Sequence, residues 1–190
     1  MTKNIMIVGV GGQGTLLASR ILGNAVISEG YDVKVSEVHG MSQRGGSVVT
    51  YVKYGKKVYS PIIDKGEADI ILAFERLEAI RALPFLKKGG KIILNDRKIS
   101  PMPVITGATT YPEGIVENLS SKVETISLDA LELSLQAGSS KAVNVVLIGE
   151  LAKSMDISKE TFIKVINETV PSKFLEMNLK AFELGYNYKG

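Results

Sequence analysis

The sequence has 190 residues and contains no cysteine. This absence excludes disulfide bonds, a catalytic thiol, thiolate zinc sites and cysteine-ligated iron–sulfur clusters within the chain. The sequence has a single histidine, His39, which also excludes a histidine-rich metal site. We therefore predict that this chain holds no metal ion of its own.

Charge and long apolar runs are also limited. The net charge is +3 and the basic residues are scattered, which argues against nucleic acid as a partner. No apolar run approaches the 18 residues of a membrane-spanning helix, so we expect no membrane association. Residues 1–4 lead directly into an apparent strand and leave no room for a signal peptide. We therefore expect a cytoplasmic protein.

The length and the order of the apolar segments predict one α/β domain over residues 1–190. Segment 4–8 ends in glycines, a helical apolar period follows from Gly14, and 33–38 gives a second strand. This pattern favours a three-layer α/β/α, Rossmann-like fold with a mainly parallel sheet. Its strands are expected at 4–8, 33–38, 47–54, 58–60, 69–74, 91–94, 104–106 and 122–128.

Two further features complete the predicted fold. Segments 47–54 and 58–60 flank a Gly-Lys-Lys turn and predict an inserted β-hairpin. A helical segment closes the chain, with Asp129 and Ser158 as helix caps and a break at Pro171. Its helix 142–153 is apolar nearly all round, which indicates either burial on most sides or a partner surface.

A glycine-rich loop follows the first strand and carries the pattern G-x-G-x-x-G. Glycines let backbone N–H groups approach an anion, and the helix that follows adds the positive end of its dipole. Glu37, at the end of the second strand, is a candidate for the ribose-binding acid of a dinucleotide site. Glycines also serve tight strand–helix packing without a ligand, so both readings stay open. The candidate cofactor-binding residues are Gly9, Gly11, Gly12, Gln13 and Gly14.

A second polar loop, HGMSQRGG, follows the second strand. Arg44 is suited to clamp a carboxylate or phosphate through two parallel hydrogen bonds, and His39 to donate a hydrogen bond or move a proton. The structural alternative is that His39 satisfies loop carbonyls while Arg44 pairs with Glu37 or Glu75. We take His39 and Arg44 as candidate catalytic residues. The cofactor-binding candidates here are Ser42, Gln43, Arg44, Gly45 and Gly46.

Together these motifs resemble the small subunit of 2-oxoacid:ferredoxin oxidoreductases. The resemblance is greatest to the beta subunit of indolepyruvate ferredoxin oxidoreductase, and the gamma subunit or domain of pyruvate ferredoxin oxidoreductase is similar. It covers nearly the whole chain, and HGMSQRGG is its most specific part. The matching segments are GVGGQG at 9–14, SEVHGMSQRGGSV at 36–48, YVKYGKKVYSP at 51–61, 68–95, NVVLIGELAK at 144–153 and NLKAFELGY at 178–186.

The resemblance implies a subunit of an enzyme that oxidatively decarboxylates a 2-oxoacid, such as indolepyruvate or a related arylpyruvate, to an acyl-CoA and reduces ferredoxin. It implies thiamine diphosphate, Mg, iron–sulfur clusters and coenzyme A for the complex rather than for this chain. The clusters and thiamine diphosphate would belong to a large partner subunit, and ferredoxin would be reached through the complex. The isolated chain is then expected to be inactive, and a homodimer is one form it could take.

Two other functions remain open from the residues alone. One is a self-sufficient Rossmann-type dehydrogenase that uses NAD, and the other is a non-catalytic nucleotide- or coenzyme-A-binding module. The dehydrogenase needs a substrate domain and a proton-transfer group, for which His39 is the only obvious candidate. The resemblance favours the subunit.

Overall fold

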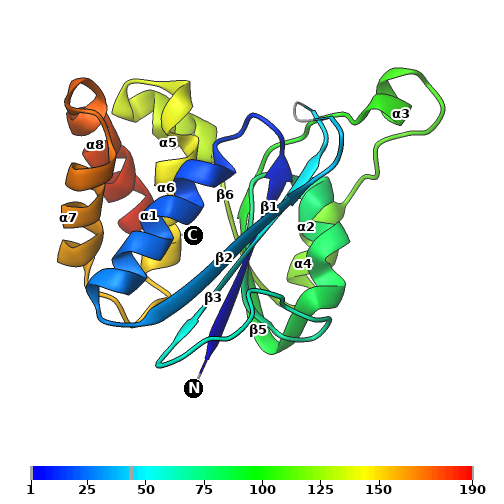
Figure 1. Ribbon diagram of the computed structural model, residues 1–190. Coiled ribbons are helices and arrows are strands. Elements are labelled where there is room, and N and C mark those ends of the chain that lie inside the picture. The colour runs from blue at the N-terminus through cyan, green and yellow to red at the C-terminus, as the bar shows by residue number, and fades with distance from the viewer. Residues whose placement is uncertain (1, 43–44, 190) are drawn as a thin grey trace.

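A six-stranded mixed sheet forms the centre of the molecule in the computed structural model, which describes residues 2–42 and 45–189 (Figure 1). The strand order is β2-β3-β1-β4-β5-β6. Strands β1, β4, β5 and β6 run parallel, whereas β3 is antiparallel to both β1 and β2. The strands are β1 (Lys3–Val10), β2 (Asp32–His39), β3 (Ser47–Gly55), β4 (Ala68–Ala73), β5 (Leu86–Asn95) and β6 (Glu124–Leu128).

The central strands are apolar on both faces because helices cover both faces of the sheet. β1 is buried from Ile5 to Val10, and β4 is buried at all but one position. Such continuous apolar runs are typical of parallel strands between two helical layers. The predicted α/β sandwich with a mainly parallel sheet is therefore confirmed.

The hairpin lies elsewhere than the sequence predicted. β2 and β3 form it, paired from Asp32 with Gly55 to His39 with Val48, so the HGMSQRGG motif begins at the last residue of β2 and ends just before β3. β3 also pairs with β1 along its whole length, so it is inserted between β1 and β2. The expected return strand at 58–60 was wrong, since this segment is irregular. The Gly-Lys-Lys turn suggested a local partner, whereas β3 pairs with the preceding strand.

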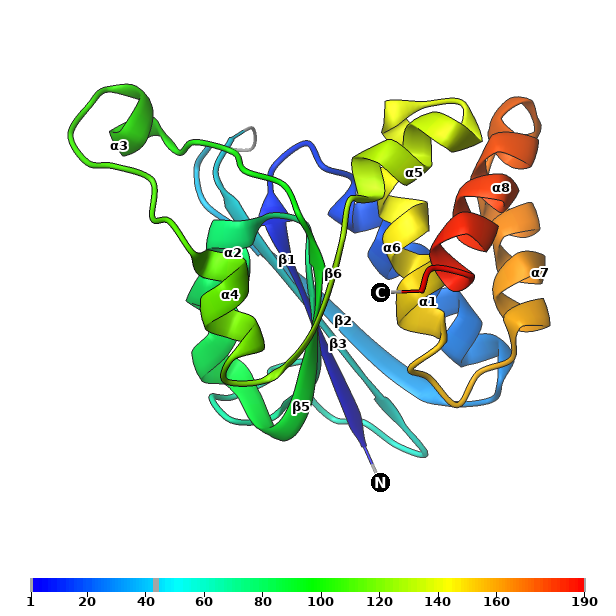
Figure 2. The ribbon, with the colours of Figure 1, turned by 180° about the vertical axis from the view of Figure 1, so that it is seen from behind.

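Helices cover the two faces of the sheet unequally (Figure 2). One face carries α1, α5, α6, α7 and α8, and the other carries α2 and α4. The longer helices are α1 (Thr15–Ser28), α2 (Arg76–Ala82), α4 (Ile115–Ser120), α5 (Ala130–Ala137), α6 (Val143–Ala152), α7 (Lys159–Thr169) and α8 (Leu175–Tyr186). The short helix α3 (Met102–Ile105) stands away from the sheet on a long loop.

Local signals predicted the helix ends well and the irregular region poorly. Asp129 accepts a hydrogen bond from the Glu132 N–H, and Ser158 accepts one from the Thr161 N–H, so both predicted caps are confirmed. The strand expected at 104–106 was wrong, because this segment forms α3 and its end. Helix α4 was missed. Within the described residues no helix is long and apolar enough to cross a lipid bilayer.

Helix α6 is buried at every position from Asn144 to Ala152, which explains its apolar surface on all sides. Of the two readings of segment 142–153, burial is confirmed. α6 and α8 approach closely through two glycines, Gly149 and Gly185. A Cβ at Gly185 would overlap the Val146 carbonyl, and one at Gly149 would overlap the Phe182 carbonyl. Any side chain at either position would force the two helices apart.

Replacing Gly185 by alanine is therefore expected to destabilise the protein by about 1–3 kcal/mol, the usual cost of overpacking. Denaturant unfolding measures this free energy. The matched control is Gly23→Ala in α1, where a Cβ meets only Val35 Cγ2 at 3.9 Å. The control should stabilise the protein by up to about 1 kcal/mol, because alanine favours helix. Equal stability of Gly185→Ala and wild type would contradict the close helix contact.

Candidate functional site

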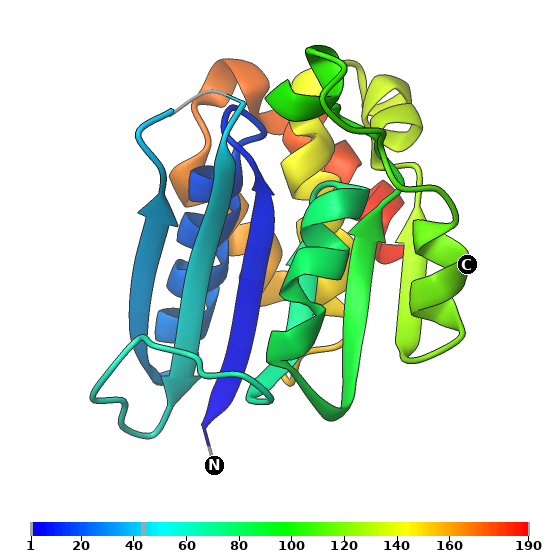
Figure 3. The same cartoon turned by 90° about the vertical axis from the view of Figure 1, so that its right-hand side faces the viewer.

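The two glycine-containing loops lie together at the carboxyl end of the sheet, as the sequence predicted. The Gly11 N–H donates to the Gly46 carbonyl at 2.8 Å, and the Gly45 N–H donates to the Gly11 carbonyl at 3.3 Å. These bonds extend the β1–β3 pairing beyond Val10 and Ser47. Gly46 is also tightly packed within its own loop, since a Cβ there would lie 2.6 Å from the Ser42 carbonyl oxygen. The pairing of β3 with β1 thus joins the loops (Figure 3).

Gln13 holds the glycine loop in place with both ends of its side chain. Its Oε1 accepts from the Val10 N–H at 2.7 Å, and its Nε2 donates to the Phe74 carbonyl at 2.9 Å. The loop after β1 is thereby tied to the end of β4, across the point where the chain connections leave toward opposite sides of the sheet. In open α/β sheets ligands bind at such switch points. Gln13 is thus a brace of the loop.

Asn95 and Asn144 attach the helical layer to the same place. Asn95 donates from Nδ2 to the Phe74 carbonyl at 3.1 Å and accepts from the Ala130 N–H at 3.2 Å. Asn144 donates from Nδ2 to the Gly14 carbonyl at 3.2 Å. Buried amides with such partners fix a site rigidly. The ends of β1, β4 and β5 and the first turns of α5 and α6 therefore form one connected unit.

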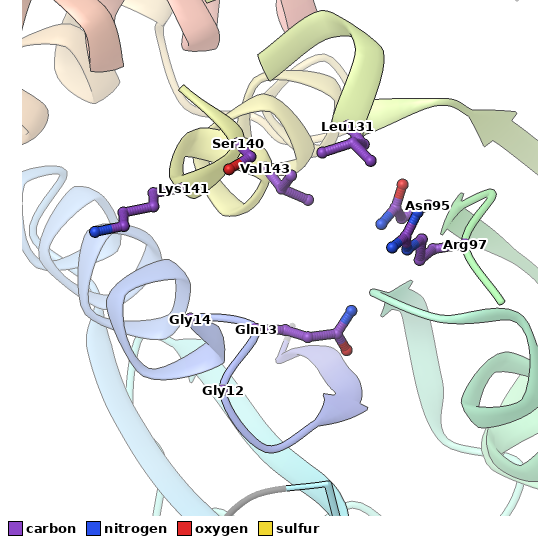
Figure 4. A pocket seen from close by; sticks show the side chains of 9 residues that line it. All are labelled: Gly12, Gln13, Gly14, Asn95, Arg97, Leu131, Ser140, Lys141 and Val143. Atoms are coloured by element: carbon purple, nitrogen blue, oxygen red, sulfur yellow. The ribbon is translucent and has the colours of Figure 1, made fainter. Parts of the chain in front are cut away.

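A cavity of about 300 Å³ opens above this unit (Figure 4). Arg97 and Asn95 stand on one side of it, Lys141 and Ser140 on the other, and Gln13 lies at its base. Its lining includes two cations and no carboxylate, and we call it the basic cavity. Its described lining residues are Gly12, Gln13, Gly14, Asn95, Arg97, Leu131, Ser140, Lys141 and Val143.

Helix α1 begins at the wall of the basic cavity without a side-chain cap. Its N-cap residue is Gly14, with φ of 82°, and its first turn contains no acidic residue. The first N–H groups of a helix have no partner within the helix, and the dipole favours negative charge there. Together with Arg97 and Lys141, this end of α1 makes the basic cavity suited to an anionic group.

A second cavity, of about 440 Å³, lies on the other side of the glycine loop and has a different character. We call it the hairpin cavity. Glu37 and His39 of β2 line it together with Val48, Thr15 and Leu16 of α1, and the loop residues Gly11, Gly12 and Gly14. Glu37 accepts a hydrogen bond from Thr50 Oγ1 at 3.2 Å, and His39 Nδ1 lies 3.0 Å from the Gly40 carbonyl oxygen. This His39 contact is the loop-carbonyl role considered above.

The position of Glu37 differs from that in a dinucleotide-binding site. In that site the acid-bearing strand lies beside the strand of the glycine loop. Here β3 lies between β1 and β2, so Glu37 is two strands from β1, roughly 10 Å at the usual strand spacing. The glycine pattern is therefore present without the strand neighbour that reads a ribose.

The structure distinguishes the candidate binding residues by their local roles. Gly9 is packed against Phe74, since a Cβ there would lie 2.9 Å from that side chain. Gly12 and Gly14 line both cavities. Gly11, Gly45 and Gly46 form the junction of the two loops. Gln43 and Arg44 lie outside the described residues, and ligand binding by this whole set, Ser42 included, stays a prediction.

Sequence reasoning missed Arg97, Lys141, Ser140 and Asn95. Asn95 is the last residue of the buried part of β5 and Arg97 follows two residues later, which was a usable signal, because parallel strands end at one edge of the sheet. Ser140 and Lys141 precede the buried helix α6 by a few residues. Because Ser140 and Lys141 are far from Gly14 along the chain, the sequence did not indicate that these residues line the same cavity.

Glu75 joins this edge of the sheet to the loop that carries α3. Its carboxylate is 1% exposed and caps α2 by accepting from the N–H groups of Leu77 at 2.6 Å and Glu78 at 3.0 Å. It also accepts from the Ile99 N–H at 3.0 Å and from the Tyr111 hydroxyl. Burial, together with this bond to Glu75, raises the pKa of Tyr111. Glu75 therefore connects the start of α2 to both ends of the loop that carries α3.

Comparison with known proteins identifies the family. The model of the family described as pyruvate ferredoxin/flavodoxin oxidoreductase matches residues 4–188. The chain belongs to this family of oxidoreductases. Among the described residues, no three His, Cys, Asp or Glu side chains gather in a way that would hold a metal ion.

Relatives of similar length show which subunits of these enzymes the chain resembles. The chain is 45% identical over 190 residues to indolepyruvate oxidoreductase subunit IorB of Thermococcus kodakarensis, covering 96% of this chain and 93% of that one. It is 27% identical over 183 residues to the common gamma subunit of the pyruvate/ketoisovalerate oxidoreductases of the same organism, covering 94% and 92%. The gamma subunit of a keto/oxoacid ferredoxin oxidoreductase from Geobacter sulfurreducens has the same fold, with a TM-score of 0.73, 24% identity and coverage of 97% and 96%.

Replacing Gln13 by leucine tests its role as a brace. The variant should lose about 1–2 kcal/mol of stability, because the Val10 N–H and the Phe74 carbonyl each lose a hydrogen-bond partner. Denaturant unfolding measures the loss. The exposed Gln136→Leu is the matched control and should change stability by less than about 0.5 kcal/mol. Unchanged stability of Gln13→Leu would instead favour a side chain that serves only a ligand.

Proposed function

We propose that this chain is the small subunit of a 2-oxoacid:ferredoxin oxidoreductase whose oxoacid is indolepyruvate or a related arylpyruvate. The observation that carries the assignment is the similarity along the whole chain. Four relatives named as indolepyruvate oxidoreductase subunits are 38–45% identical, whereas the pyruvate and ketoisovalerate subunits are 26–27% identical. The complete enzyme would decarboxylate the oxoacid oxidatively, form an acyl-CoA and reduce ferredoxin.

The redox cofactors of this complex would lie in a large partner subunit. A chain without cysteine cannot ligate iron–sulfur clusters through thiolates, so the electron path to ferredoxin must run through other chains. Thiamine diphosphate, with Mg, would supply the electron sink that makes cleavage of the bond to the carboxylate possible. We further propose that residues 1–190 act as one domain and that the complex works in the cytoplasm.

This chain would contribute a binding site for an anionic group of coenzyme A. The basic cavity supports this role, because Arg97 and Lys141 belong to its lining on opposite sides and no carboxylate lines it. The free N–H groups at the start of α1 would bind phosphate oxygens, and Ser140 would add a hydroxyl. The hairpin loop with Arg44 would lie against the shared active site. The residues act by binding and orienting, which lowers the entropic part of the barrier.

The alternative function is a stand-alone nucleotide- or coenzyme-A-binding protein. The glycine loop and the basic cavity would serve such a protein as well. The insertion of β3 between β1 and β2 argues against an NAD site of the usual geometry, since Glu37 is not on the neighbouring strand. Calorimetric titration of the isolated chain with NAD, NADP and coenzyme A separates the readings, because a stand-alone binder should take up one of them at micromolar concentration.

Omission of this chain from the complex tests the proposed function directly. The large subunit is expressed with and without it, and indolepyruvate-dependent reduction of ferredoxin or a viologen is measured. We expect activity only from the pair, because the large subunit alone lacks the coenzyme A contacts. Equal activity of the large subunit with and without this chain would overturn the proposal.

Charge removal at the basic cavity tests its role within the complex. Arg97→Ala and Lys141→Ala should each raise the KM for coenzyme A by about tenfold, equivalent to about 1.4 kcal/mol, with a smaller effect on the KM for the oxoacid. Arg44→Ala should lower activity well beyond any loss of folding, because alanine cannot replace a guanidinium clamp. Steady-state kinetics of the reconstituted complex provide all three values.

The matched controls are Arg20→Ala and Lys122→Ala, which remove the same charges from exposed positions outside the basic cavity. Their KM for coenzyme A should stay within twofold of wild type. If they raise it as much as the cavity variants, the effect comes from net charge and not from the site.

A further inference from the structure

The segment at the end of β5 separates two cavities of different composition. Asn95 and Arg97 line the basic cavity (Figure 4), whereas Asp96 and Lys98 line a separate cavity of about 230 Å³, which we call the mixed cavity. Successive side chains therefore point to opposite sides of this segment, as they do in a strand. The carboxylate that directly precedes Arg97 in the chain is thereby kept out of the lining of the basic cavity.

The Arg97 guanidinium is available to a ligand. Among residues 2–42 and 45–189, no carboxylate, carbonyl or aromatic ring pairs with it. The same holds, within these residues, for the ammonium group of Lys141 across the basic cavity. A guanidinium in this state can bind two oxygens of a phosphate or carboxylate. Its availability depends on the acids near it being held by other groups.

Arg76, the first residue of α2, contacts both Asp96 and Arg97. Its N–H donates to the Arg97 carbonyl at 3.0 Å, and its Nε donates to Asp96 Oδ1 at 2.5 Å. The Asp96 N–H donates in turn to the Leu128 carbonyl at 2.8 Å, which fixes the segment from β6 as well. The backbone bond of Arg76 thus positions Arg97, and its side chain neutralises the acid beside Arg97.

This ion pair matters more for the charge of the mixed cavity than for stability. The charged lining residues of the mixed cavity are Arg76, Lys98, Asp96, Glu113 and Glu117. Arg76 and Asp96 are 35% and 36% exposed, and ion pairs at such exposure contribute little to stability. Without the Arg76 charge, three carboxylates would face one cation on the far side of the segment from the basic cavity. Their field would weaken the binding of an anion at Arg97.

We propose that Arg76 is a positioning residue for anion binding in the basic cavity. It holds the Asp96 carboxylate in the mixed cavity and so leaves the Arg97 guanidinium to the anionic group of coenzyme A. This inference rests on the proposed function, and it names a residue outside the basic cavity on which coenzyme A binding depends.

The test compares four complexes of the large subunit with wild type, Arg76→Met, Asp96→Asn and the double variant. Arg76→Met keeps the backbone N–H and the aliphatic stem but releases Asp96. It should raise the KM for coenzyme A about fivefold, with kcat within about twofold of wild type. Asp96→Asn should leave this KM at or below the wild-type value, because the carboxylate is gone and the cation stays. The double variant should return to within about twofold of wild type, because the released charge is absent.

A purely structural ion pair predicts a different pattern. Arg76→Met and Asp96→Asn would then raise the KM for coenzyme A alike, since each breaks the same bond, and the double variant would not recover. That pattern, or an unchanged KM in Arg76→Met, would overturn the inference. The difference between Arg76→Met and wild type should also narrow with rising salt, because ions screen an exposed carboxylate. A difference independent of salt would count equally against the inference.

The matched control is Lys159→Met, which breaks the partly exposed ion pair with Glu183 and changes the net charge equally. Neither residue belongs to the described lining of the basic or the mixed cavity. Its KM for coenzyme A should stay within about twofold of wild type, and a fivefold rise there would overturn the inference. Thermal unfolding midpoints of the isolated variants should stay within about 4 °C of wild type.

The cavity variant Arg97→Ala distinguishes this inference from the proposed function. If Arg97→Ala leaves the KM for coenzyme A unchanged, the proposed role of the basic cavity is wrong. If Arg97→Ala raises this KM and Arg76→Met does not, the proposed role stands and only the positioning role of Arg76 is wrong.

Discussion

The insertion of β3 between β1 and β2 determines how this molecule builds its site. Backbone pairing on both sides of β3 fixes its register, and the same ladder continues into the bonds between Gly11 and the Gly45-Gly46 pair. Two loops that are distant along the chain thereby become one surface. A one-residue shift in pairing would turn every side chain of β3 to the opposite face of the sheet. Because its buried side chains would then leave the core, burial stabilises the observed register.

The glycine loop then serves as a wall between two cavities of different charge. Arg97 and Lys141 line the basic cavity, whereas Glu37 and His39 line the hairpin cavity. An anionic ligand is therefore expected on the side of the helical layer. Gln13 holds this loop in place, because both ends of its side-chain amide form hydrogen bonds with backbone groups. Glycines without Cβ atoms and one anchored amide make the loop thin and rigid, as close approach of a phosphate requires.

The features predicted from sequence were those that neighbouring residues determine. Buried strands, the caps Asp129 and Ser158, and the apolar helix α6 follow from local pattern and side-chain chemistry. The hairpin was misplaced because pairing partners depend on the whole sheet, and a turn signal at 55–57 suggested a nearer one. Arg97 and Lys141 were missed for a related reason. Each belongs to a different element, and only the fold brings them to one cavity.

The same edge of the sheet connects the basic cavity to the loop that carries α3. Glu75 caps α2 and also binds both ends of the loop that carries α3, and Arg97, just before this loop, lines the basic cavity. A carboxylate that is 1% exposed and bound by four donors is costly to move, because any lost partner leaves buried charge unsatisfied. The buried anchor of this loop therefore also restrains Arg97 at the wall of the basic cavity. In a chain without cysteine, a rigid wall of this kind would hold a coenzyme at a fixed position relative to redox centres that another chain carries.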